Sequence, residues 1–284
     1  MPEGDTVRHL ADRLNGERAG SIITSCALRH PRVAGYNLTG CRLESFDAYG
    51  KHLFMRLDDD RVLHIHLLMT GRWSTRPTPG IPAWRRRVEF DTDRGPLIGI
   101  DVPIVELGPA AAEEAITAHL GPDLCSPQPR PPTELLAERL RAGPPCALTA
   151  ALLDQRRLAG FGNVYAVDLP FIAGLDPSVA VADVDGLDNL VDVGTAMIRE
   201  NARRGVQNTL GREMHRSATW AQGRRNRRCR VCGNSMVGYP EPEVEWHRVV
   251  TTCVTCQPAG SHTVDLDRMK HLVGSHPGLH RRQH

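Results

Sequence analysis

The sequence contains very little lysine and no long apolar segment. Among its 284 residues only Lys51 and Lys270 are lysines, so arginine supplies nearly all of the positive charge. No run of about 18 apolar residues occurs, which argues against a membrane-spanning helix. Charged side chains interrupt the segment from Asp5 to Arg13, so the start of the chain lacks the apolar core of a secretory signal peptide. We therefore expect a cytoplasmic protein with no membrane partner.

The length and the charge distribution say more than the net charge, which is only +2. A chain of 284 residues suggests two or three domains, each large enough to bury a core. Residues 171–200 are mostly acidic among their charged positions, whereas residues 201–230 contain nine arginines and one glutamate. Such a basic block suits a polyanion such as nucleic acid. The alternatives are a solvated charged surface and the general bias toward arginine.

The chain begins Met1-Pro2-Glu3-Gly4, and removal of Met1 would make Pro2 the N-terminal residue. A free proline is a secondary amine whose pKa should lie near the ~7.7–8.0 of an α-amino group. Such an amine can attack a sugar or carbonyl carbon and form an iminium intermediate. Glu3 would place a carboxyl group beside it for proton transfer. The alternative is an ordinary start of translation, since many chains begin with Met-Pro.

Four of the eight cysteines are patterned. Cys229-x-x-Cys232 is followed, after twenty intervening residues, by Cys253-x-x-Cys256. Two such knuckles can place four thiolates around one structural zinc ion, with no open position for a catalytic water. Two disulfides are the disfavoured alternative in a reducing cytosol. The intervening residues resemble a hairpin ribbon, which carries Arg248 and would contact either phosphate or a protein partner.

The remaining segments divide into a β-rich part and a helical part. Residues 51–57 and 61–70 flank an Asp-rich turn and predict a hairpin, and a short amphipathic helix is expected after Glu3. Residues 126–132 form a Pro-rich linker, after which helices are expected at 134–141, 147–155 and 187–204. The closely spaced Gly160 and Gly162 allow a turn that presents N–H groups to a phosphate, or an ordinary connection between helices. The His-rich tail could bind metal, but we expect it to be partly disordered.

Four separated motifs resemble those of the formamidopyrimidine-DNA glycosylase and endonuclease VIII family. They occur in the family's order and cover nearly the whole chain to Pro258. The start resembles the endonuclease VIII branch more than the formamidopyrimidine branch. The motifs are Pro2-Glu3-Gly4-Asp5-Thr6, Gly50-Lys51-His52-Leu53, Leu152-Leu153-Asp154-Gln155 continuing through Gly162-Asn163-Val164-Tyr165-Ala166, and the four-cysteine finger that ends at Cys256-Gln257.

The resemblance implies an α+β fold with damaged DNA as the partner. It implies an N-terminal β-sandwich with a leading helix, a helical domain with a helix–two-turn–helix motif, and a C-terminal zinc finger. The corresponding expected boundaries are a catalytic domain at 1–125, a linker at 126–134, a DNA-binding domain at 135–222, a finger at 223–258 and a flexible tail at 259–284. The chain would be a monomer, associated with the nucleoid when it acts, with one structural zinc and no organic cofactor.

The resemblance also assigns roles to residues. Pro2 would attack C1′ of a flipped nucleotide, Glu3 would protonate the ring oxygen, and β,δ-elimination would cut the strand. Lys51, Asn163 and Arg248 match phosphate-contacting residues of the family. Met69 matches a residue that fills the gap left by the flipped base, although a core or loop methionine is an equal alternative.

The sequence departs from the family at two places, and only the first bears on the choice of lesion. The Arg-Phe pair of the formamidopyrimidine branch is absent from residues 100–107, which favours oxidised pyrimidines over 8-oxoguanine as substrates. Asp168 stands where the family often has Glu. Two other functions compete with a bifunctional DNA glycosylase and AP lyase. One is a lesion-recognition or structural DNA-binding protein of the same fold with a retained Met1, and the other is a zinc-ribbon factor that binds proteins.

Overall fold

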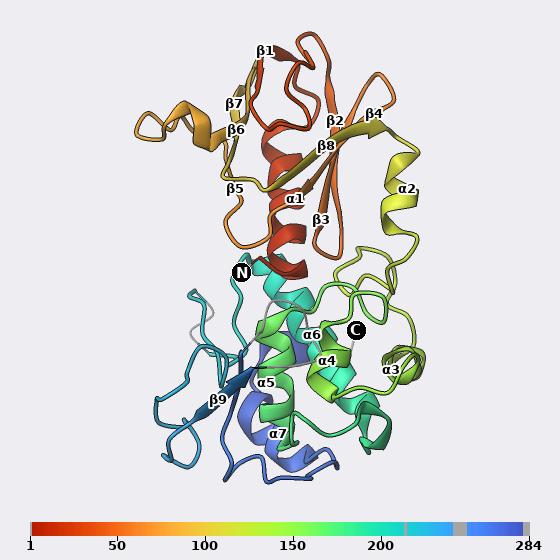
Figure 1. Cartoon of the computed structure of the whole chain (residues 1–284), viewed down its shortest axis with the longest axis vertical. Coiled ribbons are helices and arrows are strands. Elements are labelled where there is room, and N and C mark those ends of the chain that lie inside the picture. The colour runs from red at the N-terminus through yellow and green to blue at the C-terminus, as the bar shows by residue number, and fades with distance from the viewer. Residues whose placement is uncertain (1, 213–214, 241–248, 281–284) are drawn as a thin grey trace. The chain divides into compact units, whose positions relative to one another are not determined.

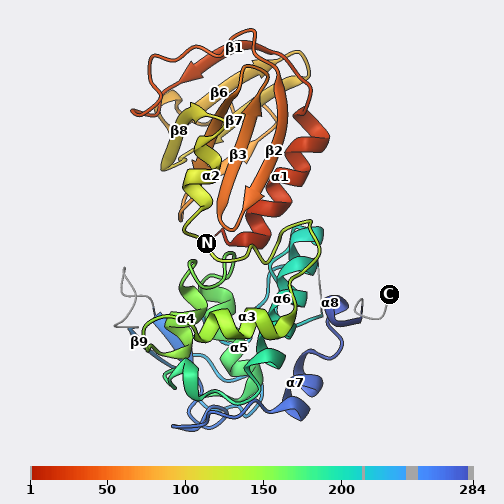
Figure 2. The same ribbon diagram turned by 90° about the vertical axis from the view of Figure 1, so that its right-hand side faces the viewer.

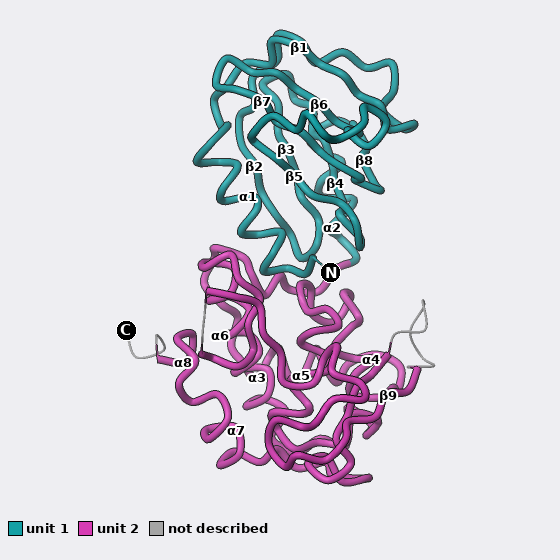
Figure 3. Tube along the Cα trace, turned by 90° about the vertical axis from the view of Figure 1, so that its left-hand side faces the viewer, with its two compact units in different colours: residues 1–119 teal, residues 120–284 magenta. Residues whose placement is uncertain are grey.

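The computed structural model describes residues 2–212, 215–240 and 249–280. The chain forms two compact units, residues 1–119 and residues 120–284, which are coloured separately in Figure 3. This boundary precedes the expected domain end at residue 125, because Leu124 and Cys125 pack in the core of the second unit. No helix of the described ranges combines the length and the apolar character needed to cross a bilayer.

The first unit consists of two four-stranded antiparallel sheets and a leading helix (Figures 1 and 2). The strand orders are β1-β6-β7-β5 and β2-β3-β4-β8. The strands are β1 (Ile23–Leu28), β2 (Leu43–Tyr49), β3 (His52–Leu57), β4 (Arg61–His66), β5 (Arg72–Ser74), β6 (Arg86–Thr92), β7 (Gly95–Ile100) and β8 (Ile104–Pro109). The helices are α1 (Gly4–Arg18), the short η1 (Ala83–Arg85) and α2 (Ala112–Thr117).

Side-chain alternation explains why these strands form a sandwich. Leu53 and Met55 on β3 and Leu63 and Ile65 on β4 all point into one core. Because successive side chains of a strand face opposite ways, the residues between them occupy the other face of the sheet. Phe90 of the opposite sheet contributes to the same core. The predicted hairpin at 51–70 and the N-terminal β-sandwich with a leading helix are confirmed.

The second unit is built around two buried helices, α5 and α6. Its helices are α3 (Thr133–Arg141), α4 (Leu148–Leu153), α5 (Asn163–Ala173), η2 (Val181–Asp183), α6 (Leu187–Arg204), α7 (Leu266–Val273) and α8 (Pro277–His280). Helix α5 is apolar on nearly all sides, as expected for a core helix. The three helices expected at 134–141, 147–155 and 187–204 are present as α3, α4 and α6.

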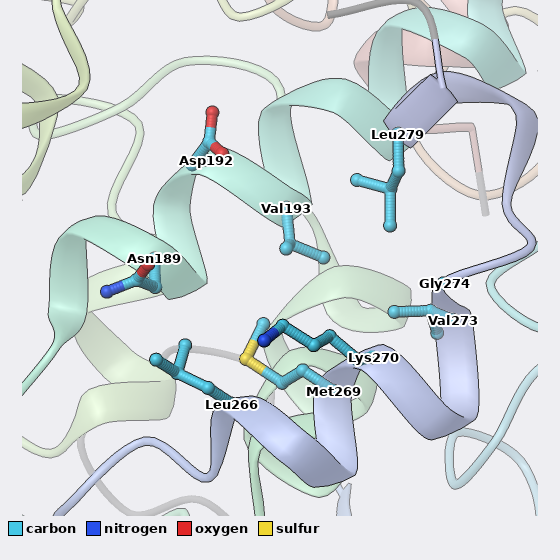
Figure 4. Close-up of a pocket in the computed structure, with 9 residues that line it drawn as sticks. All are labelled: Asn189, Asp192, Val193, Leu266, Met269, Lys270, Val273, Gly274 and Leu279. Atoms are coloured by element: carbon cyan, nitrogen blue, oxygen red, sulfur yellow. The ribbon is translucent and has the colours of Figure 1, made fainter.

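The cysteine ribbon and the tail complete the second unit. Strands β9 (Val237–Pro240) and β10 (Val249–Thr252) pair antiparallel, as the predicted hairpin requires. The expectation of a flexible tail is wrong for residues 266–280, because α7 and α8 fold onto the helical core. Met269 and Val273 are almost fully buried. Between α6, α7 and α8 a pocket of about 250 Å³ remains, lined by Val193, Met269 and Leu279 among others (Figure 4).

Candidate active site

The N-terminal residues are held at the start of α1. Glu3 is fully buried and immediately precedes the helix, and its carbonyl accepts a hydrogen bond from Val7 N–H at 3.0 Å. The N-terminus of a helix favours a negative charge, which suits a carboxylate at this position. Pro2 is half-buried. Pro2 and Glu3 are therefore attached to a rigid element, as a nucleophile and a proton donor require.

Lys51 lies in a two-residue turn that joins β2 and β3. Tyr49 pairs with His52, and Gly50 adopts a positive φ of 55°, a conformation that glycine tolerates at such turns. The N-terminus, the start of α1 and this turn lie at the same end of the first unit (Figures 1 and 2). The structure thus brings the segments carrying three sequence-predicted site residues, Pro2, Glu3 and Lys51, to one end of the sandwich.

Arg8 and Asp47 connect these two segments, and sequence reasoning did not single them out. The Arg8 guanidinium donates to the carbonyl of Ala48 at 2.5 Å and lies 2.8 Å from the Asp47 carboxylate. Arg8 is nearly buried. Its contacts join α1 to the end of β2, two residues before the turn. Asp5 and Arg18 are also buried on α1, so the amphipathic pattern alone gave no signal that set Arg8 apart.

Met69 occupies an exposed loop between β4 and β5. Its side chain is 68 % exposed, so the interpretation as a core methionine is wrong. Neighbouring Leu68 has a positive φ of 44°, a conformation that is uncommon for a large residue. Thr70 Oγ1 donates to the carbonyl of Asp101 at 3.1 Å, which attaches the loop to the β7–β8 connection. Exposed apolar side chains on a strained, anchored loop are typical of a contact site.

Asn163 is the first residue of α5 in the second unit. The preceding turn is held by Gln155, whose amide donates to the carbonyls of Leu153 and Phe161, both at 2.8 Å, and whose Oε1 accepts from Gly160 N–H at 3.0 Å. Asn163 Oδ1 is buried without a hydrogen-bond partner within the described chain. A buried amide oxygen without a partner is expected to accept a hydrogen bond from an external donor or from an ordered water.

Asp168, the departure from the family's usual Glu, is a buried anchor. Its carboxylate accepts from the Thr209 hydroxyl and from three consecutive amides, those of Trp220, Ala221 and Gln222, at 2.7–2.9 Å. Burial raises the pKa of this carboxyl, while the four donors act in the opposite direction. The shorter side chain therefore fixes the segment that leads into the cysteine ribbon.

The four patterned cysteines converge. Their sulfur atoms all lie within 4.8 Å of one another, and this is the only group of three or more such ligands in the described ranges. Cys229 Sγ and Cys256 Sγ are 3.8 Å apart, and Cys232 Sγ and Cys253 Sγ are 3.4 Å apart. A tetrahedral ion with metal–sulfur bonds of about 2.3 Å would separate its ligands by about 3.8 Å. The donor set therefore fits a metal ion.

The other sequence-predicted site residue, Arg248, lies outside the described residues. The candidates also divide between the two units: Pro2, Glu3, Lys51 and Met69 belong to the first, whereas Asn163 and the cysteines belong to the second.

Comparisons with known proteins agree with this arrangement. Residues 1–101 match the family model of the formamidopyrimidine-DNA glycosylase N-terminal domain. The chain is 36% identical over 263 residues to a probable endonuclease 8 2 of Streptomyces coelicolor, covering 90% of this chain and 94% of that protein. It is 35% identical over 259 residues to the DNA-(apurinic or apyrimidinic site) lyase Nei2 of Mycolicibacterium smegmatis, covering 91% and 100%.

A solved structure shares the fold. The formamidopyrimidine-DNA glycosylase of Lactococcus lactis, bound to DNA containing an AP site, superposes with a TM-score of 0.75 at 21% identity, covering 90% of this chain and 100% of that one. The two sequence relatives above are named as an endonuclease 8 and as Nei2, and each matches along nearly its full length. The chain belongs to the formamidopyrimidine-DNA glycosylase and endonuclease VIII family of DNA glycosylases and AP lyases, on its endonuclease VIII branch.

Proposed function

We propose that this chain is a bifunctional DNA glycosylase and AP lyase of base excision repair that acts through Pro2. The observation that carries the proposal is the position of Pro2 and Glu3 at the start of α1, with the Glu3 carboxyl fully buried. Family membership supports the reaction class, and the relatives named endonuclease 8 and Nei2 support the branch. Loss of Met1 is part of the proposal, because only then is the Pro2 amine free.

The chemistry follows from these two groups. The Pro2 nitrogen attacks C1′ of the flipped nucleotide, the glycosidic bond breaks, and the base leaves with its electron pair. Glu3 protonates the ring oxygen as the C1′–O bond opens, which yields an iminium. The iminium acidifies the C2′ proton, so the 3′-phosphate leaves by β-elimination. A δ-elimination then releases the 5′-phosphate, and hydrolysis of the iminium frees Pro2.

The DNA contacts are proposed for both units. Lys51, Asn163 and Arg248 would bind phosphates beside the lesion, and Met69 would enter the space left by the flipped nucleotide. Oxidised pyrimidines are the proposed substrates, supported by the absence of an Arg-Phe pair at 100–107. The second unit would provide the helix–two-turn–helix surface. We further propose a monomer that acts in the cytoplasm at the nucleoid.

The metal held by Cys229, Cys232, Cys253 and Cys256 is proposed to be zinc in a structural role. Four thiolates match a closed zinc site and leave no position for a catalytic water. When bound, the ion would hold the two knuckles together and support the folding of the short ribbon. Elemental analysis of the purified chain should find one zinc per molecule. Another metal at equal occupancy would contradict this assignment.

Borohydride trapping tests the main proposal. The chain is incubated with duplexes containing thymine glycol, 8-oxoguanine or an abasic site, and borohydride then reduces any iminium to a stable amine. We expect covalent attachment at Pro2, located by peptide mass spectrometry, with faster trapping on the pyrimidine lesion than on 8-oxoguanine. Pro2→Gly and Glu3→Gln should abolish strand scission.

An intact-mass measurement accompanies this test. A native mass that includes Met1, or no adduct with any of the three duplexes, would contradict the proposed mechanism. Retained, salt-sensitive binding to lesion DNA without an adduct would instead support a recognition protein of the same fold.

A further inference from the structure

Three histidines lie on the face of the β2-β3-β4-β8 sheet that points away from the main core. His52 pairs with His66 across β3 and β4, and His64 pairs with Glu106 across β4 and β8. Phe54 lies beside them on β3 and is fully buried. An aromatic apolar residue is thus accommodated on this face, so packing alone does not require imidazoles.

His52, His64 and Glu106 form a hydrogen-bonded chain. His52 Nδ1 lies 2.9 Å from His64 Nε2, and His64 Nδ1 lies 3.1 Å from the carboxylate of Glu106. Arg32 pairs with the same carboxylate. Because the ionised Glu106 only accepts, neutral His64 must carry its proton on Nδ1 and accept from His52 Nδ1–H at Nε2. The carboxylate therefore determines the tautomer of both rings.

The other end of the cluster reaches two loops that carry candidate site residues. His52 directly follows Lys51, and its ring contacts that of His66 edge-on at 5.0 Å between centroids. His66 Nδ1 accepts from Leu68 N–H at 3.1 Å, which holds the loop that presents Met69. The cluster thus connects the lysine turn to the exposed loop within the first unit.

The charge state of the rings fits this position. The pKa of His52 is lowered to about 3 and that of His66 to about 4, mainly by burial, and the Lys51 ammonium acts in the same direction on both rings. The other groups facing them are His64, His119 and, through His64, Glu106. The rings are therefore neutral near pH 7 and add no positive charge beside Lys51.

We propose that His52 and His66 are positioning residues that hold the Lys51 turn and the Leu68–Met69 loop in the geometry that engages lesion DNA. The tautomer of His52 is set by His64 and Glu106, whereas that of His66 is set by the Leu68 N–H that its Nδ1 accepts. This inference rests on the proposed function, since Lys51 and Met69 are its DNA contacts. A metal site at the histidines is not supported, because among the described residues only the four cysteines form a group of metal-ligand geometry.

A double-mutant cycle tests the coupling. The rate of borohydride-trapped adduct formation is measured at saturating abasic DNA for wild type, His52→Leu, Lys51→Ala and the double variant. In the His52→Leu variant the lysine should be misplaced, so its trapping rate should fall by about tenfold or more relative to wild type. In the Lys51→Ala background the same change should have an effect of less than about twofold, because coupled residues are not additive.

Two matched variants separate positioning from packing. In His52→Asn the amide Nδ2 can replace the Nδ1–H donor, so its trapping rate should stay within about threefold of wild type. Phe54→Leu perturbs the same face without removing a hydrogen bond, and its rate should also stay within about threefold. Long-range ¹⁵N–¹H spectra, assigned with the histidine variants, should show His64 as the Nδ1–H tautomer and the Nε2–H form in Glu106→Leu.

The outcomes distinguish this inference from the proposed function. Equal slowing by His52→Leu in both backgrounds, or an Nε2–H tautomer of His64 in the wild type, would overturn the positioning role and leave the glycosylase proposal intact. Absence of a trapped adduct in the wild type would overturn the proposed function, while the tautomer measurement would still report on the hydrogen-bonded chain.

Discussion

Single residues decide how closely the elements approach one another. Gly194 lies in α6, and an added Cβ there would fall 2.7 Å from Leu169 and 2.8 Å from Phe161, both fully buried. Phe161 belongs to the turn before Asn163, so this contact also supports a proposed phosphate site. Gly16 in α1 is the opposite case, since its added Cβ would meet nothing within 4 Å.

Gly194→Ala and Gly16→Ala should therefore have opposite effects on stability. Overpacking at Gly194 should cost about 1–3 kcal/mol, which exceeds the gain of about 0.5–1 kcal/mol from replacing a helical glycine. Gly16→Ala should show that gain alone, because its site is exposed and helical. Urea unfolding followed by circular dichroism measures both. A stabilised Gly194→Ala would show that the α5–α6 contact is looser than the structure indicates.

At the scale of elements, the sequence predicted the strands and motifs that can be recognised from residues close together in the chain. Alternation of apolar residues identified the β3–β4 hairpin, and the Cys-x-x-Cys spacing identified four candidate metal ligands, which the structure brings together. The histidine cluster depends on which strands pair and in which register, and no local pattern encodes that pairing. The missed helix α7 did have a signal: Asp265 caps it by accepting from Arg268 N–H at 2.9 Å, and Leu266, Met269 and Val273 have helical spacing.

The histidines of β3 and β4 should make stability fall on mild acidification. The ordinary histidine pKa of 6.5 applies to the unfolded chain, whereas in the folded chain the pKa values of His52 and His66 are lowered to about 3 and about 4. Between pH 6.5 and about 4 the unfolded state therefore binds more protons, so the free energy of unfolding falls as pH falls. Each histidine should contribute up to about 1.4 kcal/mol per pH unit.

Urea unfolding at pH 7.0 and pH 5.0 measures this dependence, with His52→Asn combined with His66→Gln as the comparison. The double variant should lose less stability on acidification than the wild type, since it lacks the two titrating rings. Equal losses in the two proteins would place the acid sensitivity elsewhere in the molecule.

At the scale of the whole molecule, the second unit includes the last part of the chain. Arg268 donates to the carbonyl of Phe171 on α5, at 3.2 Å from Nε and 3.0 Å from a terminal guanidinium nitrogen, and His276, which is fully buried, lies 3.2 Å from the carbonyl of Asn208. An added Cβ on Gly278 would lie 2.4 Å from the carbonyl of Ala196 on α6. The composition of the tail suggested disorder because the residues that make these contacts, Arg268, His276 and Gly278, are not apolar.

Truncation of side chains on α7 should distinguish a packed helix from an appendage. Met269→Ala removes a side chain that is only 3% exposed and should cost about 2–5 kcal/mol. Leu266→Ala on the same helix is the matched control, because Leu266 is 46% exposed and its loss should cost less than about 1 kcal/mol. Thermal unfolding of the full chain, followed by circular dichroism, compares the two variants. Equal midpoints would contradict the packing of α7 against the core.

The packing of α7 on α5 also affects the order in which parts of the chain can fold during synthesis. Domains fold as units during synthesis, beginning with the N-terminal one. The first unit contains all of its own core, so it can fold while translation continues. Helix α5, which carries Asn163, cannot complete its surroundings until residues 264–273 have left the ribosome. We therefore expect a stage of synthesis at which the first unit, which carries Pro2, is already folded. At that stage α5, which carries the proposed phosphate-binding residue Asn163, has not yet packed against α7.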